Sequence, residues 1–225
     1  IVGGHTGFYN AVTLPTIGGI TVWGTGRKYI TPAGAQVGDA VIITKGAAIE
    51  AAALLACELE ERLLAAGVPS GLVERARKRL REMSVVAEAG IAAEVGGVHA
   101  MHDATEGGVA RGLWEVAEAA GVGLLIERSQ VILPEDVQAV CSHFNLNPYE
   151  VISEGTLVLT CLPDKVKALI EAFNAAGLEA AAIGQVVPLA EGRCWVEKDG
   201  STEELLPPSV DRFWEVFFNA LTIKD

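Results

Sequence analysis

The chain has 225 residues, of which half are hydrophobic and only 6% aromatic, a composition typical of a well-packed α/β protein and not of a disordered one. Its 17 basic and 29 acidic residues give a net charge of −12, which argues against a nucleic-acid surface or an anionic membrane as a partner. No apolar stretch is free enough of charges to span a bilayer and no signal-peptide pattern opens the chain, so we expect a cytoplasmic protein.

The first part of the chain has the pattern of the end of a larger unit. Residues 13–22 form an apolar, β-branched run that predicts a strand. A phrase rich in turn residues then leads into a buried strand at residues 40–44, so we place a domain boundary near Gly38. We expect residues 1–37 to be the remnant of an N-terminal domain, which would bind ATP and form a dimer, and residues 38–225 to be a C-terminal domain.

Beyond this boundary, apolar residues at helical spacing alternate with short apolar runs. Strands that alternate with helices predict an α/β (α+β) fold, in which helices cover a mixed sheet. The predicted helices are residues 49–66, 72–82 with Ser70 as N-cap, a third helix to about 95 with Ser84 as N-cap, 108–121, 134–144, 163–177 and an aromatic tail helix that includes 213–218; the predicted strands are residues 98–101, 122–127, 156–161, 181–187 and 193–197.

Residues 98–113 are the most informative stretch, because they predict a strand, a polar glycine loop and a helix in direct succession. His102, Asp103 and Thr105 follow the strand and precede the pair Gly107-Gly108. A helix N-terminus has unpaired backbone N–H groups that suit an anion such as phosphate, and glycines let a ligand approach the backbone closely. Spacing alone also permits a plain turn in which Thr105 or Asp103 caps the helix.

The sequence His-Asp-Ala-Thr-Glu-Gly-Gly-Val-Ala at residues 102–110 resembles the His-Asp-x-Thr-x-Gly-Gly-Leu-Ala element of the aminoimidazole-ribonucleotide (AIR) synthase superfamily. Within that superfamily the chain is most similar to the hydrogenase expression/formation proteins HypE and to AIR-synthase-related proteins. The resemblance implies a PurM-like C-terminal domain, preceded by a truncated N-terminal one. Further matching phrases occur in the same order: Gly-Gly-His-Thr at 3–6, Thr-Lys-Gly-Ala-Ala-Ile-Glu at 44–50, Asn-Pro-Tyr at 147–149, Ser-Glu-Gly at 153–155 and Ile-Gly-Gln-Val at 183–186.

The resemblance implies an ATP-dependent enzyme that phosphorylates an amide or similar oxygen and so turns it into a leaving group. In HypE this chemistry dehydrates a carbamoyl group during the maturation of NiFe hydrogenases. The implied cofactors are ATP and Mg²⁺ in the full-length protein. The implied assembly is a homodimer, with a second maturation protein as a partner and no nucleic acid or membrane.

The same resemblance assigns roles to individual residues. His5 and His102 are candidate acids, bases or phosphate donors, and Glu154 is the candidate for removal of an amide proton. Asp103 is the candidate metal ligand. The residues expected to bind the cofactor are Gly3, Gly4, Thr6, Asp103, Thr105, Gly107 and Gly108.

The sequence departs from the HypE pattern at three places. Position 5 is His instead of Asp, Gly7 stands where HypE has a lysine, and the chain ends in Asp225 instead of a cysteine. The family's glycine-rich ATP segment and paired magnesium aspartates are expected before Ile1, so we expect this chain alone to be inactive. The alternatives are a non-catalytic scaffold that binds a maturation partner, or an activity of the selenophosphate synthetase or thiamine-monophosphate kinase type.

Overall fold

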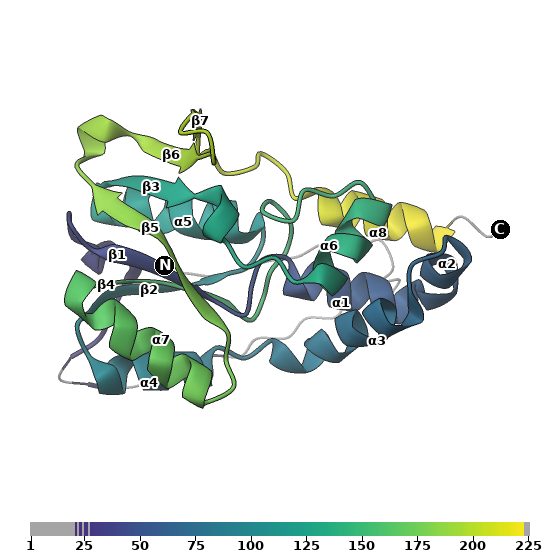
Figure 1. Cartoon of the computed structure of the whole chain (residues 1–225), viewed down its shortest axis with the longest axis horizontal. Helices are drawn as coiled ribbons and strands as arrows, with labels where there is room; N and C mark the ends of the chain where they lie inside the picture. Colours follow the sequence, from purple (N-terminus) through teal and green to yellow (C-terminus); the bar gives the residue numbers. More distant parts are fainter. Residues whose placement is uncertain (1–20, 22, 24, 27, 223–225) are drawn as a thin grey trace.

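The computed structural model describes residues 21, 23, 25–26 and 28–222, and within them the chain forms one mixed sheet flanked by helices (Figure 1). The seven strands of this part of the chain have the order β2-β4-β1-β5-β3-β6-β7, and neighbours are antiparallel except for β3 and β6. The strands are β1 (Ala40–Thr44), β2 (Val98–Ala104), β3 (Gly123–Glu127), β4 (Thr156–Cys161), β5 (Ala180–Val187), β6 (Arg193–Val196) and β7 (Thr202–Glu204).

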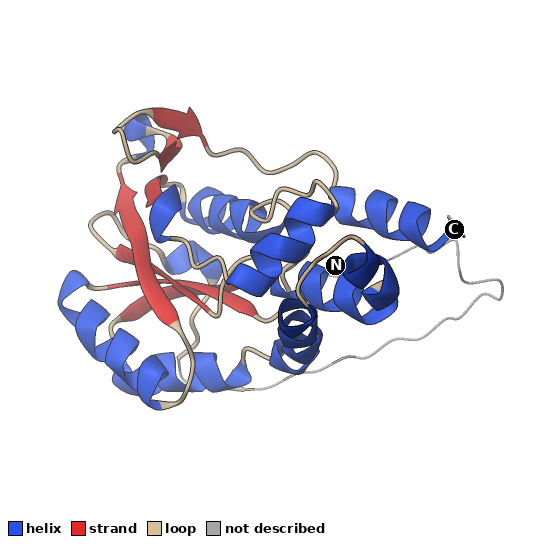
Figure 2. Cartoon of the chain, turned by 45° about the vertical axis from the view of Figure 1, so that its right-hand side comes forward, coloured by secondary structure: helices blue, strands red, loops and turns tan. Residues whose placement is uncertain are grey.

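The helices fall into three groups. One helix, α5, covers one face of the sheet, while α4 and α7 lie together on the opposite face. The remaining helices gather at one end of the sheet, as Figures 1 and 2 show. The helices are α1 (Ile49–Glu58), α2 (Glu60–Ala65), α3 (Ser70–Lys78), α4 (Val86–Val95), α5 (Gly108–Ala120), α6 (Glu135–His143), α7 (Val166–Ala175) and α8 (Arg212–Thr222).

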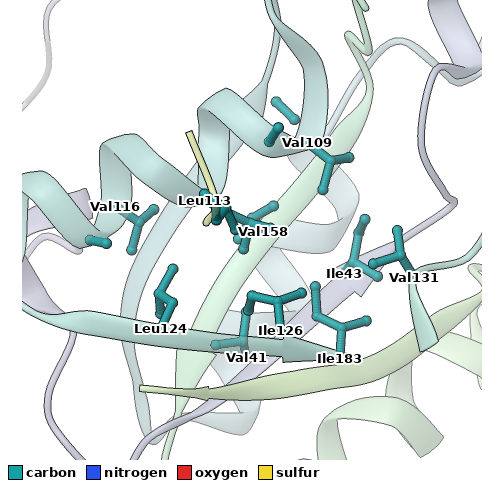
Figure 3. Packing of buried hydrophobic residues seen from close by; sticks show 14 of the residues in the cluster. Val41, Ile43, Val109, Leu113, Val116, Leu124, Ile126, Val131, Val158 and Ile183 are labelled. Atoms are coloured by element: carbon teal, nitrogen blue, oxygen red, sulfur yellow. The ribbon is translucent and has the colours of Figure 1, made fainter. Parts of the chain in front are cut away.

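The contact between α5 and the sheet fixes the position of the loop that precedes this helix. Val109, Leu113 and Val116 repeat at helical spacing on the buried face of α5, and they pack onto side chains of β1, β3, β4 and β5 (Figure 3). Leu113 has no exposed surface. Truncation of such a buried leucine to alanine costs about 2–5 kcal/mol, so α5 is held firmly against the strands.

The predicted α/β class, a mixed sheet covered by helices, is confirmed, but three details of the prediction were wrong. The helix expected at residues 49–66 is interrupted at Leu59, whose φ of −125° lies outside the helical range, so it forms α1 and α2. Neither serine is the N-cap residue: Ser70 is the first residue of α3, and Val85 precedes α4, although the Oγ of Ser84 accepts a hydrogen bond from Val86 N–H (3.3 Å). The short, exposed strand β7 was not predicted.

The prediction for the central stretch also needs a correction. The strand expected to end at Met101 continues through His102 and Asp103 to Ala104, because β4 pairs with it along this whole length. The predictions for residues 1–20 lie outside the described residues. The boundary near Gly38 stays a prediction, while Pro32–Gly34 form a 3₁₀ helix that packs against α5 and β2.

Candidate functional site

The loop between β2 and α5 requires both of its glycines. Gly107 has a φ of +74° and Gly108 a φ of +61°, a region that residues with a Cβ rarely adopt. A Cβ on Gly108 would lie 2.5 Å from the carbonyl oxygen of Val151, and a Cβ on Gly107 would lie 2.4 Å from Nε of Arg111. The glycines therefore allow the loop to pack tightly against the turn before β4 and against its own helix.

The side chain of His102 links β2 to α5 through two carboxylates. Its Nε2 lies 2.8 Å from Oε2 of Glu115, and its Nδ1 lies 3.3 Å from Oδ1 of Asp103. The hydrogen bond to Asp103, together with that to Glu115, raises the pKa of His102 although burial lowers it. The same bond lowers the pKa of Asp103. Both ring nitrogens thus have acceptors, an arrangement that favours the imidazolium form.

Glu154 lies in the turn before β4, which is the antiparallel neighbour of β2. Ala104 pairs with Thr156, so the turn that carries Glu154 returns to the end of β2. Burial, and then the negative charge of Asp103, raises the pKa of Glu154. The backbone N–H of Glu154 donates to Oε2 of Glu50 (2.9 Å) at the start of α1, and burial also raises the pKa of Glu50.

The turn before β4 ties the loop to α1. The backbone N–H of Ser153 donates to the carbonyl of Thr105 (3.2 Å), and its hydroxyl accepts a hydrogen bond from the N–H of Ala48 (2.8 Å). Thr156 donates its hydroxyl hydrogen to the carbonyl of Gly46 (2.6 Å). The N-termini of α1 and α5 therefore meet at this turn, and both place positive partial charge beside the carboxylates.

The sequence did not predict the residue that occupies the start of α5. Oδ2 of Asp211, from the segment before α8, accepts a hydrogen bond from the N–H of Gly107 (2.8 Å). Neither Thr105 nor Asp103 caps α5 with its side chain. The only sequence signal for Asp211 is its place as the residue before a predicted helix, where its Oδ1 accepts the N–H of Phe213 (2.9 Å).

The structure brings together His102, Asp103, Glu154 and the loop that contains Thr105, Gly107 and Gly108. Gly3, Gly4, His5 and Thr6 lie outside the described residues, so their predicted approach to this loop stays a prediction.

The metal assignment rests on Asp103. Within the described residues, no group of three or more His, Cys, Asp or Glu side chains is arranged to hold a metal ion. The side chain of Asp103 is 48% exposed, which leaves its second oxygen accessible. Mg²⁺ is commonly bound by one or two carboxylates together with substrate phosphates, so a single carboxylate at this place fits that pattern.

Two further observations concern surfaces away from the loop. A hollow of about 650 Å³ lies over β3, β5 and β6, and no predicted site residue lines it. In the described part of the chain, no helix has the length and apolar character that crossing a membrane requires.

The fold and the loop together define a mixed-sheet α/β domain in which an edge strand, a glycine loop and a covering helix follow one another. The chain belongs to the family described as AIR synthase related protein, C-terminal domain, whose model matches residues 36–197.

Curated relatives share part of this sequence. The chain is 34% identical over 104 residues to the hydrogenase expression/formation protein HupE of Azotobacter chroococcum mcd 1, which covers 45% of the chain and 30% of that protein. It is 38% identical over 96 residues to the carbamoyl dehydratase HypE of Rhizobium leguminosarum bv. viciae, which covers 41% of the chain and 27% of that protein. The matched stretches therefore span less than a third of these relatives.

Solved structures show the same fold over a longer range. An E. coli HypE structure superposes with a TM-score of 0.67 at 24% identity, and the match covers 81% of this chain and 53% of that one. A HypE structure in complex with ATP has a TM-score of 0.61 at 22% identity, with 82% and 55% covered. The chain thus has the fold of about half of a HypE molecule, and the expected relationship to HypE is confirmed.

Proposed function

We propose that this chain supplies part of the active site of a HypE-related, ATP-dependent cytoplasmic enzyme that activates an amide oxygen by phosphorylation. The observation that carries the proposal is that the His102–Asp103 pair lies at the end of β2, directly before the Gly107-Gly108 loop, and that the turn with Glu154 returns to the same end of β2. The family match and the carbamoyl dehydratases among the relatives support it. A HypE structure in complex with ATP supports a nucleotide as the ligand.

In this proposal the β2–α5 loop binds phosphate, and His102 acts only as a nearby positive charge because both of its ring nitrogens have carboxylate partners. A protonated His102 places positive charge at the end of β2, and its two carboxylate partners fix the ring. Thr105 and Gly107 provide the hydroxyl and backbone donors that phosphate oxygens accept, and Gly108, whose own N–H donates to the Thr105 carbonyl (3.0 Å), lets the ligand approach the backbone closely. Asp103 holds Mg²⁺, which reduces the repulsion between phosphate charges when it is bound.

Glu154 removes the proton of the activated amide. A carboxylate with an ordinary pKa is a weak base at neutral pH, and partial desolvation together with the charge of Asp103 raises the pKa of Glu154 and hence its basicity. His5, Gly3, Gly4 and Thr6 belong to the same proposed ligand site. We further propose that the full-length protein is a homodimer and binds a second maturation protein, in line with a solved HypE–HypF complex of the same fold.

The enzyme proposal is tested by ATP turnover in the natural full-length protein. We expect Glu154→Gln to lower kcat by about 100-fold or more, the range for loss of a general base, and Glu150→Gln in the same loop to leave it unchanged. We expect no turnover from the present 225-residue chain alone. Equal turnover by the Glu154→Gln variant and the wild type contradicts the assigned role.

A second candidate has a specific observation in its favour. Thiamine-monophosphate kinase from Aquifex aeolicus has the same fold, with a TM-score of 0.54 at 19% identity over 79% of this chain. A kinase transfers the phosphoryl group to a product that persists, whereas a dehydratase releases inorganic phosphate. A full-length protein that binds ATP without any turnover would instead favour a scaffold that recruits a maturation partner.

A further inference from the structure

The segment of residues 206–212, called the strap below, crosses the candidate site between two buried anchors. Leu205 and Phe213 have no exposed surface, whereas Leu206 and Val210 between them are 57% and 68% exposed. The strap follows β7 and leads into α8 (Figure 1). It buries little apolar surface of its own, so polar contacts must hold it in place.

These polar contacts concentrate on the β2–α5 loop. The carboxylate of Asp211 accepts hydrogen bonds from the backbone N–H groups of Gly107 (2.8 Å), Phe213 (2.9 Å) and Ile152. The carbonyl of Pro208 accepts a hydrogen bond from the Arg111 guanidinium. One carboxylate therefore binds amide groups from three separate parts of the chain, as a phosphate oxygen does at a helix N-terminus.

The same place retains a donor that the strap does not satisfy. Nε of Arg111 is buried and, in the part of the chain that the structure describes, has no hydrogen-bond partner. It lies next to Gly107, close to where a Cβ on that glycine would be. A buried guanidinium N–H without an acceptor is costly, and an anion larger than a carboxylate would satisfy it.

The charged form of the Asp211 carboxylate is also disfavoured at its position beside Gly107. Burial raises its pKa even though the three amide hydrogen bonds lower it, and the charge of Glu106 raises it further. The bound state of the strap is thus opposed by desolvation and by a like charge. The Asp211 contact therefore orders the strap, but an anion with more acceptor oxygens, such as a phosphate group, can compete with it.

We infer that the strap is an autoinhibitory latch, in which Asp211 occupies the anion position at Gly107 that a phosphate group of the ligand requires. This inference rests on the proposed function, because it takes the ligand to be a nucleotide. Ligand binding must then displace Asp211 from Gly107, and the Arg111 guanidinium passes from the carbonyl of Pro208 to the phosphate. The strap opens over the loop while Leu205 and Phe213 keep its two ends attached.

The latch is tested first without any ligand, by amide hydrogen exchange and by trypsin cleavage after Arg212 in the full 225-residue chain. In Asp211→Ala we expect the Gly107 amide to exchange at least about tenfold faster and trypsin cleavage to accelerate, while the Leu113 amide in α5 keeps its rate. Asp211→Asn, which keeps an acceptor oxygen, is expected to fall between. The control is Asp199→Ala, which removes a carboxylate that accepts the backbone N–H of Ser201 (2.9 Å) in the β6–β7 turn.

The exchange rates separate a local contact of Asp211 from global destabilisation, and the competition with ATP below separates a latch from a merely structural contact. Unchanged Gly107 exchange in Asp211→Ala overturns the latch, and so does acceleration that is equal at Gly107 and Leu113, because that reports global destabilisation. Should Asp211→Ala fail to fold, the same comparison in Asp211→Asn decides.

Competition is tested with ATP on the natural full-length protein. We expect Asp211→Ala to bind ATP about tenfold more tightly than the wild type, and ATP to remove the protection of the Gly107–Asp211 contact in the wild type. ATP binding with equal affinity in both forms contradicts the latch while leaving the proposed function intact. If neither form binds ATP, the proposed function fails, and the proposed competition between ATP and Asp211 fails with it. The exchange and trypsin rates then decide alone whether Asp211 holds the strap in place.

Discussion

Substitution of Gly108 by alanine tests whether the tight packing of the β2–α5 loop supports the fold around the candidate site. Two costs add at this position. A residue with a Cβ pays about 1–2 kcal/mol in the left-handed region, and Gly108 has a φ of +61°. The new Cβ would also lie 2.5 Å from the Val151 carbonyl and 2.9 Å from that of Tyr149, and such overpacking costs about 1–3 kcal/mol. We expect a total loss of about 2–5 kcal/mol in the free energy of unfolding.

The matched control is at the other end of the same helix. Gly121 has a φ of +68°, but nothing lies within 4 Å of the place where its Cβ would be. Gly121→Ala should therefore cost only the conformational term, about 1–2 kcal/mol. Urea unfolding followed by circular dichroism measures both variants. Equal losses in the two variants would refute the reasoning, because they would show that the turn before β4 moves away without cost.

Three further predictions follow from the described contacts. Because the pKa of His102 is raised, its contribution to stability is complete below about pH 6.5 and is lost as the pH rises through the folded-state pKa, so the difference in unfolding free energy between wild type and His102→Gln should shrink as the pH rises from about 6.5 through that folded-state pKa. A difference that stays constant over this range would contradict a protonated His102. Lys45 and Glu88 form a buried ion pair with exposed fractions of 7% and 1%, so Lys45→Met should cost about 3–5 kcal/mol, and a second change of Glu88→Gln should restore part of it in thermal unfolding. The full-length protein should sediment as a homodimer at micromolar concentration, and a monomer there would exclude the proposed assembly.

Most of the fold was predictable because its signals are local. Apolar spacing in α5 and the continuous apolar run of β4 report burial directly, and the expected ranges of 108–121 and 156–161 agree with the observed Gly108–Ala120 and Thr156–Cys161. The end of β2 was not predictable in this way. His102 and Asp103 are polar and suggest a loop, yet pairing of Asp103 with Leu157 satisfies their backbone whatever the side chain is.

The partners of the site residues were harder to predict than the residues themselves. His102 and Asp103 stood out by their types and positions, but no sequence pattern marks Glu115 as the residue that binds His102. Asp211 is 104 residues from Gly107 along the chain, and no local pattern reports such a contact. Sequence reasoning therefore found the loop and missed the segment that covers it.

Nucleotide binding by Asp103→Asn in the natural full-length protein tests the central claim most directly, with isothermal titration of Mg-ATP as the measurement. The substitution keeps the size of the side chain and removes the charge that would hold Mg²⁺ and pair with His102. We predict that the affinity falls about tenfold or more, equivalent to about 1.4 kcal/mol, while Asp164→Asn at an exposed position before α7 leaves it unchanged. An unchanged affinity in Asp103→Asn would contradict the claim and leave the β2–α5 loop a structural turn.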